Sequence, residues 1–119
     1  QQRLFTEMND AIKAFVKDLK QNNRFNDVLF FTFSEFGRRV AQNASNGTDH
    51  GTANNMFFIS GGLKQKGLIN EMPDLANLDE GDLKFKVDFK NAYATVLKKW
   101  LNADDRSILT KQYDYLNFI

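Results

Sequence analysis

Hydrophobic residues near the start of the chain recur with the period of an α-helix. The apolar positions between Leu4 and Leu19 follow helical spacing, while lysine and aspartate side chains occupy the other side. This pattern predicts an amphipathic helix of about five turns. The polar run from Lys20 to Asn23 should end the helix, because asparagine favours turns.

Two later apolar runs predict β-strands. Val28–Phe33 is β-branched and aromatic, with no polar residue before Thr32. Such a run is typical of an interior strand that is covered on both faces, as in a parallel sheet. Met56–Ser60 repeats the pattern and stops at Gly61. Strands between helices place the chain in the α/β class.

The C-terminal half contains a long connection and a second helix. Residues 67–81 include a proline and lack periodicity, so they should form a surface connection. Apolar and polar residues then alternate up to Phe89, which indicates a half-exposed strand or an extended arm. From Phe89 to Leu101 the spacing is helical again, and Asp88 or Asn91 could cap this helix.

Composition excludes several classes of protein. With 119 residues and 42% hydrophobic side chains, the chain can form one domain with a modest core. Sixteen basic against fifteen acidic residues give a net charge of +1, which provides no broad field for nucleic acid. The absence of cysteine removes disulfides and thiolate sites. No apolar run approaches the roughly 20 residues that a membrane span needs.

The candidate chemistry lies between the two apolar strands. In α/β proteins ligands bind beyond the carboxyl ends of strands, and Ser34 and Glu35 directly follow the first strand. Glu35, Asp49 and the only histidine, His50, offer oxygen and nitrogen donors that suit zinc, manganese or a similar divalent ion. They are the candidate metal ligands.

An anionic group has candidate partners in the same segment. Arg38 or Arg39 could hold it through bidentate hydrogen bonds, and Ser34 could position it or receive a proton. The dipeptide Asn46-Gly47 predicts a turn, and Gly51 would let the backbone approach a ligand closely.

Structural roles for these residues are equally compatible with the pattern. Asp49 could cap a helix beside a hydrogen-bonded surface His50, without any metal. Glu35 and Arg38 lie three residues apart, and a local ion pair worth at most about 0.5 kcal/mol is the interpretation that spacing alone favours.

The succession of motifs resembles a bacterial family. FTFSEFGR, an Asn- and Gly-rich spacer, GTDHG and an apolar strand ending in GG are similar to the C-terminal part of the domain-of-unknown-function fifteen-oh-one family. The resemblance continues through residues 85–101. It places the chain with the alkaline phosphatase-like superfamily, and members often carry a twin-arginine export signal. The implied location is periplasmic or extracellular.

This resemblance implies a fold and a domain organisation. Residues 1–119 would be a single unit, the C-terminal fragment of a larger alkaline phosphatase-like sandwich with a mostly parallel sheet flanked by helices. The missing N-terminal half of that domain would be its main partner, and an exposed apolar face or strand edge should mark the contact. A homodimer could also form.

The same resemblance assigns the site. Glu35 and His50 stand where metal-dependent members carry ligands, and Asp49 would be a further ligand or would orient His50. A glutamate replaces the usual Asp-His pair, which leaves metal number and identity open among zinc, manganese and calcium. In the other placement Asp49 and His50 are themselves the Asp-His motif. Arg38 and Ser34 would bind the anion.

The implied activity is hydrolysis or transfer of a phosphate or sulfate ester by a metal-dependent enzyme. The superfamily's nucleophile lies in the N-terminal portion, and nothing before Asn26 could supply it. The fragment should therefore be inactive alone and contain no catalytic nucleophile. The alternative is a non-catalytic exported protein of the same fold, with a binding or structural role.

Overall fold

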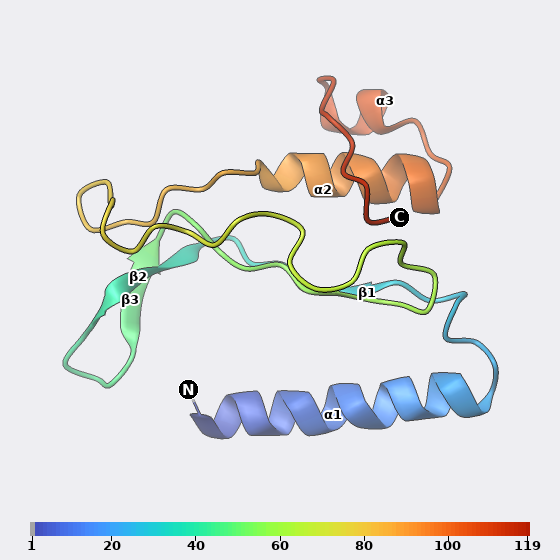
Figure 1. Ribbon diagram of the computed structural model, residues 1–119, viewed down its shortest axis with the longest axis horizontal. Helices are drawn as coiled ribbons and strands as arrows, with labels where there is room; N and C mark the ends of the chain where they lie inside the picture. The colour runs from blue at the N-terminus through green and yellow to red at the C-terminus, as the bar shows by residue number, and fades with distance from the viewer. Residues whose placement is uncertain (1) are drawn as a thin grey trace.

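The fold combines helices with short strands. The computed structural model describes residues 2–119 and is shown in Figure 1. Its elements are α1 (Gln2–Gln21), β1 (Phe30–Phe31), β2 (Gly37–Gln42), β3 (Thr48–Gly51), β4 (Phe58–Ile59), α2 (Phe89–Thr95), the π-helix η1 (Val96–Trp100) and α3 (Asp105–Leu109).

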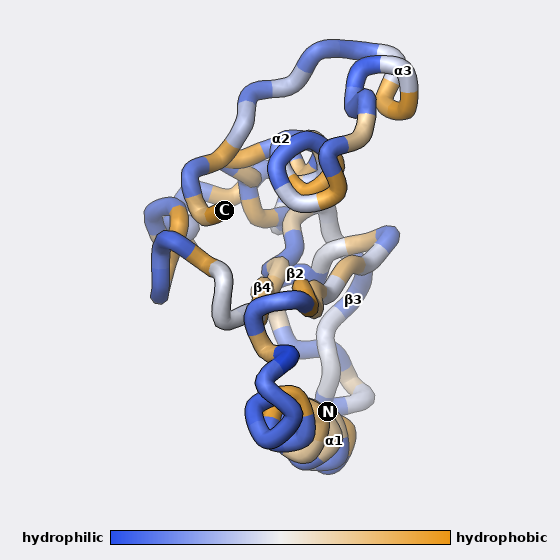
Figure 2. Tube along the Cα trace, turned by 90° about the vertical axis from the view of Figure 1, so that its right-hand side faces the viewer, coloured by the Kyte–Doolittle hydropathy of each residue, from blue (hydrophilic) through white to orange (hydrophobic). Residues whose placement is uncertain are grey.

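The two long helical segments lie on opposite sides of the β1–β4 sheet. Figures 1 and 2 show α1 on one side, the strands in the middle and α2 on the other side. Ile12 of α1 lines a groove together with Ile59 of β4. On the other face, the ring of Phe31 lies 6.3 Å from that of Tyr93 in α2. A thin sheet thus separates two helical layers.

Both sheets within residues 2–119 are antiparallel, whereas the sequence predicted a mostly parallel sheet. Phe30 lies opposite Ile59, and the Thr32 N–H donates to the Phe57 carbonyl over 3.0 Å. A parallel pair needs a crossover connection of a dozen or more residues, usually a helix. Here a β-hairpin connects β1 to β4, and the chain returns in the opposite direction. The strands are also shorter than predicted and only half-buried.

The core is small and lies between α2, η1 and the C-terminal segment. Phe118 is fully buried, and Val96 and Ile119 are each 7% exposed. The Lys64 N–H donates to the Phe118 carbonyl over 2.9 Å, which holds the C-terminal segment beside the residues that follow β4. The partly buried residues around this core are Leu29, Phe31, Phe58, Leu63, Ile69, Trp100 and Leu116.

The predicted second helix is confirmed. The Asp88 carboxylate accepts from the Lys90 N–H, so Asp88 is the cap that the sequence offered, while Asn91 lies inside the helix. The last turns widen into η1, where the Leu101 N–H donates to the Val96 carbonyl five residues earlier over 3.0 Å. The segment before Phe89 is an extended arm rather than a strand.

Helix α1 confirms the amphipathic helix predicted from Leu4 to Leu19. None of its residues is buried, and only Ile12, Val16 and Leu19 are half-buried. Within residues 2–119, no helix is both long and apolar enough to cross a membrane.

Candidate functional site

The predicted functional loop is largely a β-hairpin. Strands β2 and β3 pair with Gly37 opposite Gly51 and Arg38 opposite His50. The Asn43 N–H donates to the Gly47 carbonyl over 2.9 Å, and Asn46 adopts a positive φ of 55°. The predicted turn at Asn46-Gly47 is therefore confirmed. The strands beside it were missed because they are polar and exposed on both faces, without the alternation that marks a half-buried strand.

An aromatic contact holds the imidazole of His50. Its ring stacks on Phe36 with centroids 3.7 Å apart and an interplanar angle of 14°. The guanidinium carbon of Arg38 lies 5.1 Å from the same Phe36 ring. Arg38 also donates from Nη1 to the Thr48 carbonyl over 2.7 Å. The exposed Arg38 and His50 and the half-buried Phe36 thus form one cluster, called the hairpin cluster below.

Asp49 points away from the hairpin cluster. Successive residues of a strand project to opposite faces, so Asp49 and His50 diverge. The Asp49 carboxylate accepts a hydrogen bond from Asn43 Nδ2 over 3.0 Å. Because Asp49 lies within a strand, the interpretation as a helix cap is wrong. Its interpretation as a metal ligand remains a prediction.

Ser34 and Glu35 occupy the turn between β1 and β2, and both are exposed. Ser34 Oγ donates to the Phe36 carbonyl over 2.8 Å, which tightens this turn. Glu35 directly precedes Phe36, so its backbone lies at the same end of the molecule as His50. The local ion pair with Arg38 is absent from the ion pairs of residues 2–119, so that interpretation is wrong.

Two glycines allow the hairpin to pack closely against neighbouring residues. A Cβ at Gly37 would lie 1.8 Å from the Ala53 carbonyl oxygen. A Cβ at Gly51 would lie 2.8 Å from Asp82 Oδ1 and 2.9 Å from the carbonyl carbon of Arg38. The close approach that Gly51 permits in this structure is therefore made by protein atoms.

A second turn supports the hairpin and was not predicted from the sequence. Residues 79–82 form a two-residue turn in which Glu80 and Gly81 have φ values of 49° and 91°. Positive φ at both central positions is the type I′ geometry. Arg39 Nε lies 3.3 Å from Asp82 Oδ1, an oxygen that makes no hydrogen bond. The Glu80-Gly81 dipeptide was the available signal for this turn.

The donor set fits a metal ion only in part. His50 and Glu35 carry the nitrogen and oxygen donors that zinc or manganese accepts. In residues 2–119, however, no group of three or more histidine, aspartate or glutamate side chains is arranged to hold an ion. Among the described residues, the hairpin cluster therefore brings together fewer than three such side chains.

Away from the hairpin, the Lys86 ammonium lies 2.6 Å from the exposed Glu71 carboxylate and lowers its pKa through a hydrogen bond and its charge.

One small antiparallel sheet lies between helices, and a second forms the hairpin on which Arg38 and His50 are paired. This arrangement defines a mixed helix-and-strand protein with a polar candidate site. A family model described as "Protein of unknown function (DUF1501)" matches residues 1–114. The chain belongs to that family. No curated protein and no solved structure shows significant similarity to it.

Proposed function

We propose that this chain is the C-terminal portion of a metal-dependent phosphatase- or sulfatase-like hydrolase of the alkaline phosphatase-like superfamily, exported to the periplasm or cell exterior. The observation that carries the proposal is the register that places Arg38 directly opposite His50, close in sequence to Glu35. The Arg38 guanidinium, which suits an anion, then lies at the same end of the molecule as His50 and Glu35, which suit a divalent ion.

Each residue has a distinct role in this proposal. Arg38 presents its guanidinium to the non-bridging oxygens of a phosphate or sulfate ester. His50 and Glu35 supply part of the ligand set for the divalent ion, and Ser34 lies within the adjoining turn. When bound, such an ion neutralises ester oxygens and activates a nucleophile. The nucleophile and remaining ligands would come from the other part of the domain.

The orientation of His50 supports this assignment. The stacked Phe36 ring limits rotation of the imidazole, so the nitrogen donors are presented in a narrow range of directions. Asp49 contributes least, because its carboxylate is bonded to Asn43 on the other face of the hairpin.

The fold around the site supports membership in a larger sandwich. A two-stranded sheet is marginal on its own, and here it lies between helices with few neighbours. The register leaves Phe31 and Phe58 as a non-hydrogen-bonded pair, so their backbone N–H and C=O groups point to the two outer edges. Further strands from the remainder of the domain would pair there and extend the sheet, with parallel strands among them.

A full-length protein provides the test. The measurements are the zinc, manganese and calcium that the protein binds, and its turnover of phosphate and sulfate esters. They would be made for the wild type, His50→Ala and Glu35→Gln. We expect each substitution to lower metal affinity by about 10-fold to 100-fold or more, since His50→Ala removes the imidazole and Glu35→Gln replaces a charged carboxylate with a neutral amide. Glu71→Gln is the matched control, because this exposed carboxylate belongs to the long connection. Unchanged metal content in both site variants would contradict the assignment of His50 and Glu35 as metal ligands.

A non-catalytic exported protein of the same fold is the second candidate. It is favoured by the internal hydrogen bonds of Asp49 and Ser34, which these side chains make without any ligand. This candidate predicts that the full-length protein neither turns over esters nor retains a divalent ion after dialysis.

A further inference from the structure

The turn of the β2–β3 hairpin carries the only asparagine of the chain that is followed by a glycine. Asn46 is exposed, and Gly47 comes directly after it. An asparagine in this setting can deamidate, because the main-chain nitrogen of the next residue can attack the side-chain carbonyl carbon and expel ammonia. Glycine favours the attack, since no Cβ crowds the nitrogen. The turn is therefore a candidate site for spontaneous modification.

The reaction needs water as its only co-reactant. The Gly47 nitrogen loses its proton to solvent and forms a bond to Cγ of Asn46. The bond from Cγ to Nδ2 breaks, and the leaving nitrogen takes a proton from solvent and departs as ammonia. Water then opens either carbonyl of the resulting cyclic succinimide, which gives aspartate or isoaspartate at position 46.

Hydrogen bonds to Asn43 hold the peptide group that would have to react. The Gly47 N–H donates to Asn43 Oδ1 over 3.1 Å, and the Gly47 carbonyl accepts from the Asn43 N–H over 2.9 Å. For deamidation, the nitrogen must lose its proton and move into an attacking position at Cγ of Asn46. Bonds that hold both the proton and the peptide plane oppose these two steps.

The side chain of Asn43 is itself held in place. Its Oδ1 also accepts from the Ser45 N–H over 3.1 Å, and its Nδ2 donates to Asp49 over 3.0 Å. Both ends of the amide are thus used within the hairpin. Asn43 is half-buried as well, so its oxygen stays directed at the turn.

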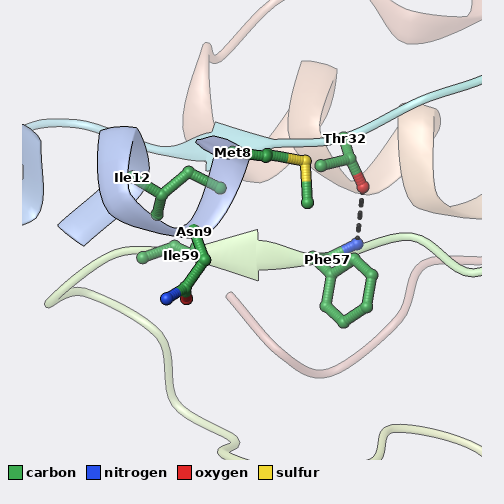
Figure 3. Close-up of a pocket in the computed structure, with 6 residues that line it drawn as sticks. All are labelled: Met8, Asn9, Ile12, Thr32, Phe57 and Ile59. Atoms are coloured by element: carbon green, nitrogen blue, oxygen red, sulfur yellow. Dashed lines mark hydrogen bonds between the residues drawn. The ribbon is translucent and has the colours of Figure 1, made fainter. Parts of the chain in front are cut away.

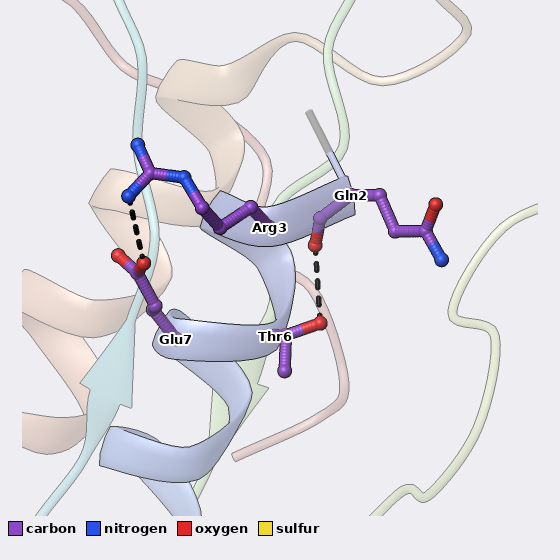
Figure 4. A network of polar contacts seen from close by, with 4 residues as sticks. All are labelled: Gln2, Arg3, Thr6 and Glu7. Carbon is purple, nitrogen blue, oxygen red and sulfur yellow. Dashed lines mark hydrogen bonds and ion pairs between the residues drawn. The ribbon is translucent and has the colours of Figure 1, made fainter.

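The asparagine of α1 is protected in a different way. Asn9 lines the groove drawn in Figure 3 and lies inside the helix, where the N–H of Asp10 belongs to the helical hydrogen-bond ladder. A side-chain bond in the same helix involves a carbonyl instead, since Thr6 Oγ1 donates to the Gln2 carbonyl over 3.1 Å (Figure 4). In the hairpin turn, which has no helical ladder, a side-chain oxygen holds the N–H after the asparagine.

We propose that Asn46 is a site of spontaneous deamidation and that the Asn43 side chain slows the reaction by holding the Gly47 amide. Aspartate at position 46 would add a negative charge to the turn. Isoaspartate would add a carbon to the main chain and disturb the pairing of Asn43 with Gly47. Either product would alter the hairpin that carries Arg38 and His50. The proposal is independent of the proposed hydrolase activity, since it uses neither an ester nor a metal ion.

Mass spectrometry of the full-length protein, aged at mildly alkaline pH, tests this proposal. We expect Asn43→Ala to deamidate at Asn46 roughly fivefold faster than the wild type or more, because it lacks the acceptor for the Gly47 N–H. Asp49→Asn is the matched control and should keep the wild-type rate, since its amide oxygen can still accept from Asn43. The wild type unfolded in urea should react faster than the folded protein.

Hydrogen exchange would verify that the hairpin persists in the variants, through the Arg38 N–H that donates to the Ala53 carbonyl over 3.2 Å. If Asn43→Ala loses the hairpin, Asn43→Ser keeps a shorter acceptor of the kind found in turns and should give an intermediate rate. Equal rates for the wild type and Asn43→Ala would overturn the proposal. Equal acceleration by Asp49→Asn would overturn it too, as would a folded wild type that reacts as fast as the unfolded one.

Discussion

Gly37 and Gly51 determine how closely the hairpin cluster approaches the rest of the chain. At Gly37 the neighbouring atom is a backbone oxygen, which cannot rotate away as a side chain can. At Gly51 the neighbours are the β2 backbone and the Asp82 carboxylate. The position of His50 therefore depends on two residues that have no side chain to contribute chemistry.

Substitution of Gly37 tests this dependence. We expect Gly37→Ala to lower the free energy of unfolding by about 3 kcal/mol, the upper end of the cost of overpacking, because a carbonyl must move. Urea denaturation would measure it. Gly62→Ala is the control, since the nearest atom there is a Trp100 side-chain carbon at 3.3 Å. Equal midpoints for the two variants would show that the backbone at Gly37 relaxes freely.

Asp105 is a second residue whose surroundings matter, because it is only 2% exposed. Tyr115 donates its hydroxyl to both carboxylate oxygens, over 3.1 and 3.0 Å. Loss of hydration, followed by the hydrogen bond to Asp105 and its charge, raises the pKa of Tyr115. The phenol must keep its proton to stabilise this contact.

Stability should therefore fall at alkaline pH. Because the folded pKa of Tyr115 is raised, its contribution is complete below the ordinary tyrosine pKa of about 10 and is lost as the pH rises through the folded value. Urea midpoints across this range should decline more steeply for the wild type than for Tyr115→Phe. Tyr113→Phe is the control and should keep the wild-type slope. Parallel slopes in all three proteins would contradict the prediction.

At the scale of elements, the sequence predicted the helices well, because helices depend on residues that are close together in the chain. The spacing of apolar residues identified α1, and Asp88 identified the start of α2. Strand direction depends on contacts between β1, which begins at Phe30, and β4, which begins 28 residues later at Phe58. No local pattern therefore specifies it. Likewise, Asp82 lies far from Arg39 in sequence, and only the folded chain brings them together. The turn at Asn46-Gly47 was thus predicted from a local signal, whereas the pairing of β2 with β3 around it was not.

The helices should also differ in how readily they unfold locally. α1 has no buried residue, whereas α2 buries Ala92, Ala94 and Thr95. Thr95 Oγ1 donates to the Asn91 carbonyl and accepts from the Leu116 N–H, over 2.6 and 2.8 Å. Hydrogen exchange should therefore be slow in α2 and fast in α1 at low protein concentration. Slow exchange throughout α1 in the monomer would contradict this ranking.

At the scale of the whole molecule, the chain is extended for its length. Its radius of gyration is 16.4 Å, against about 13.5 Å for a compact domain of this size. Few large side chains are fully buried, and Phe118 is the largest of them. A chain with so small a core gains much of its stability from whatever covers its remaining apolar surface.

The place of Phe118 and Ile119 in the core has a consequence for biosynthesis. Translation proceeds from the N-terminus, and domains generally fold as units during or after their synthesis. Because these two side chains fill the centre of the apolar cluster, the nascent polypeptide cannot close that cluster until residues 118 and 119 have left the ribosome. Until then, the aromatic residues that pack against them, Phe58 and Trp100 among them, remain uncovered.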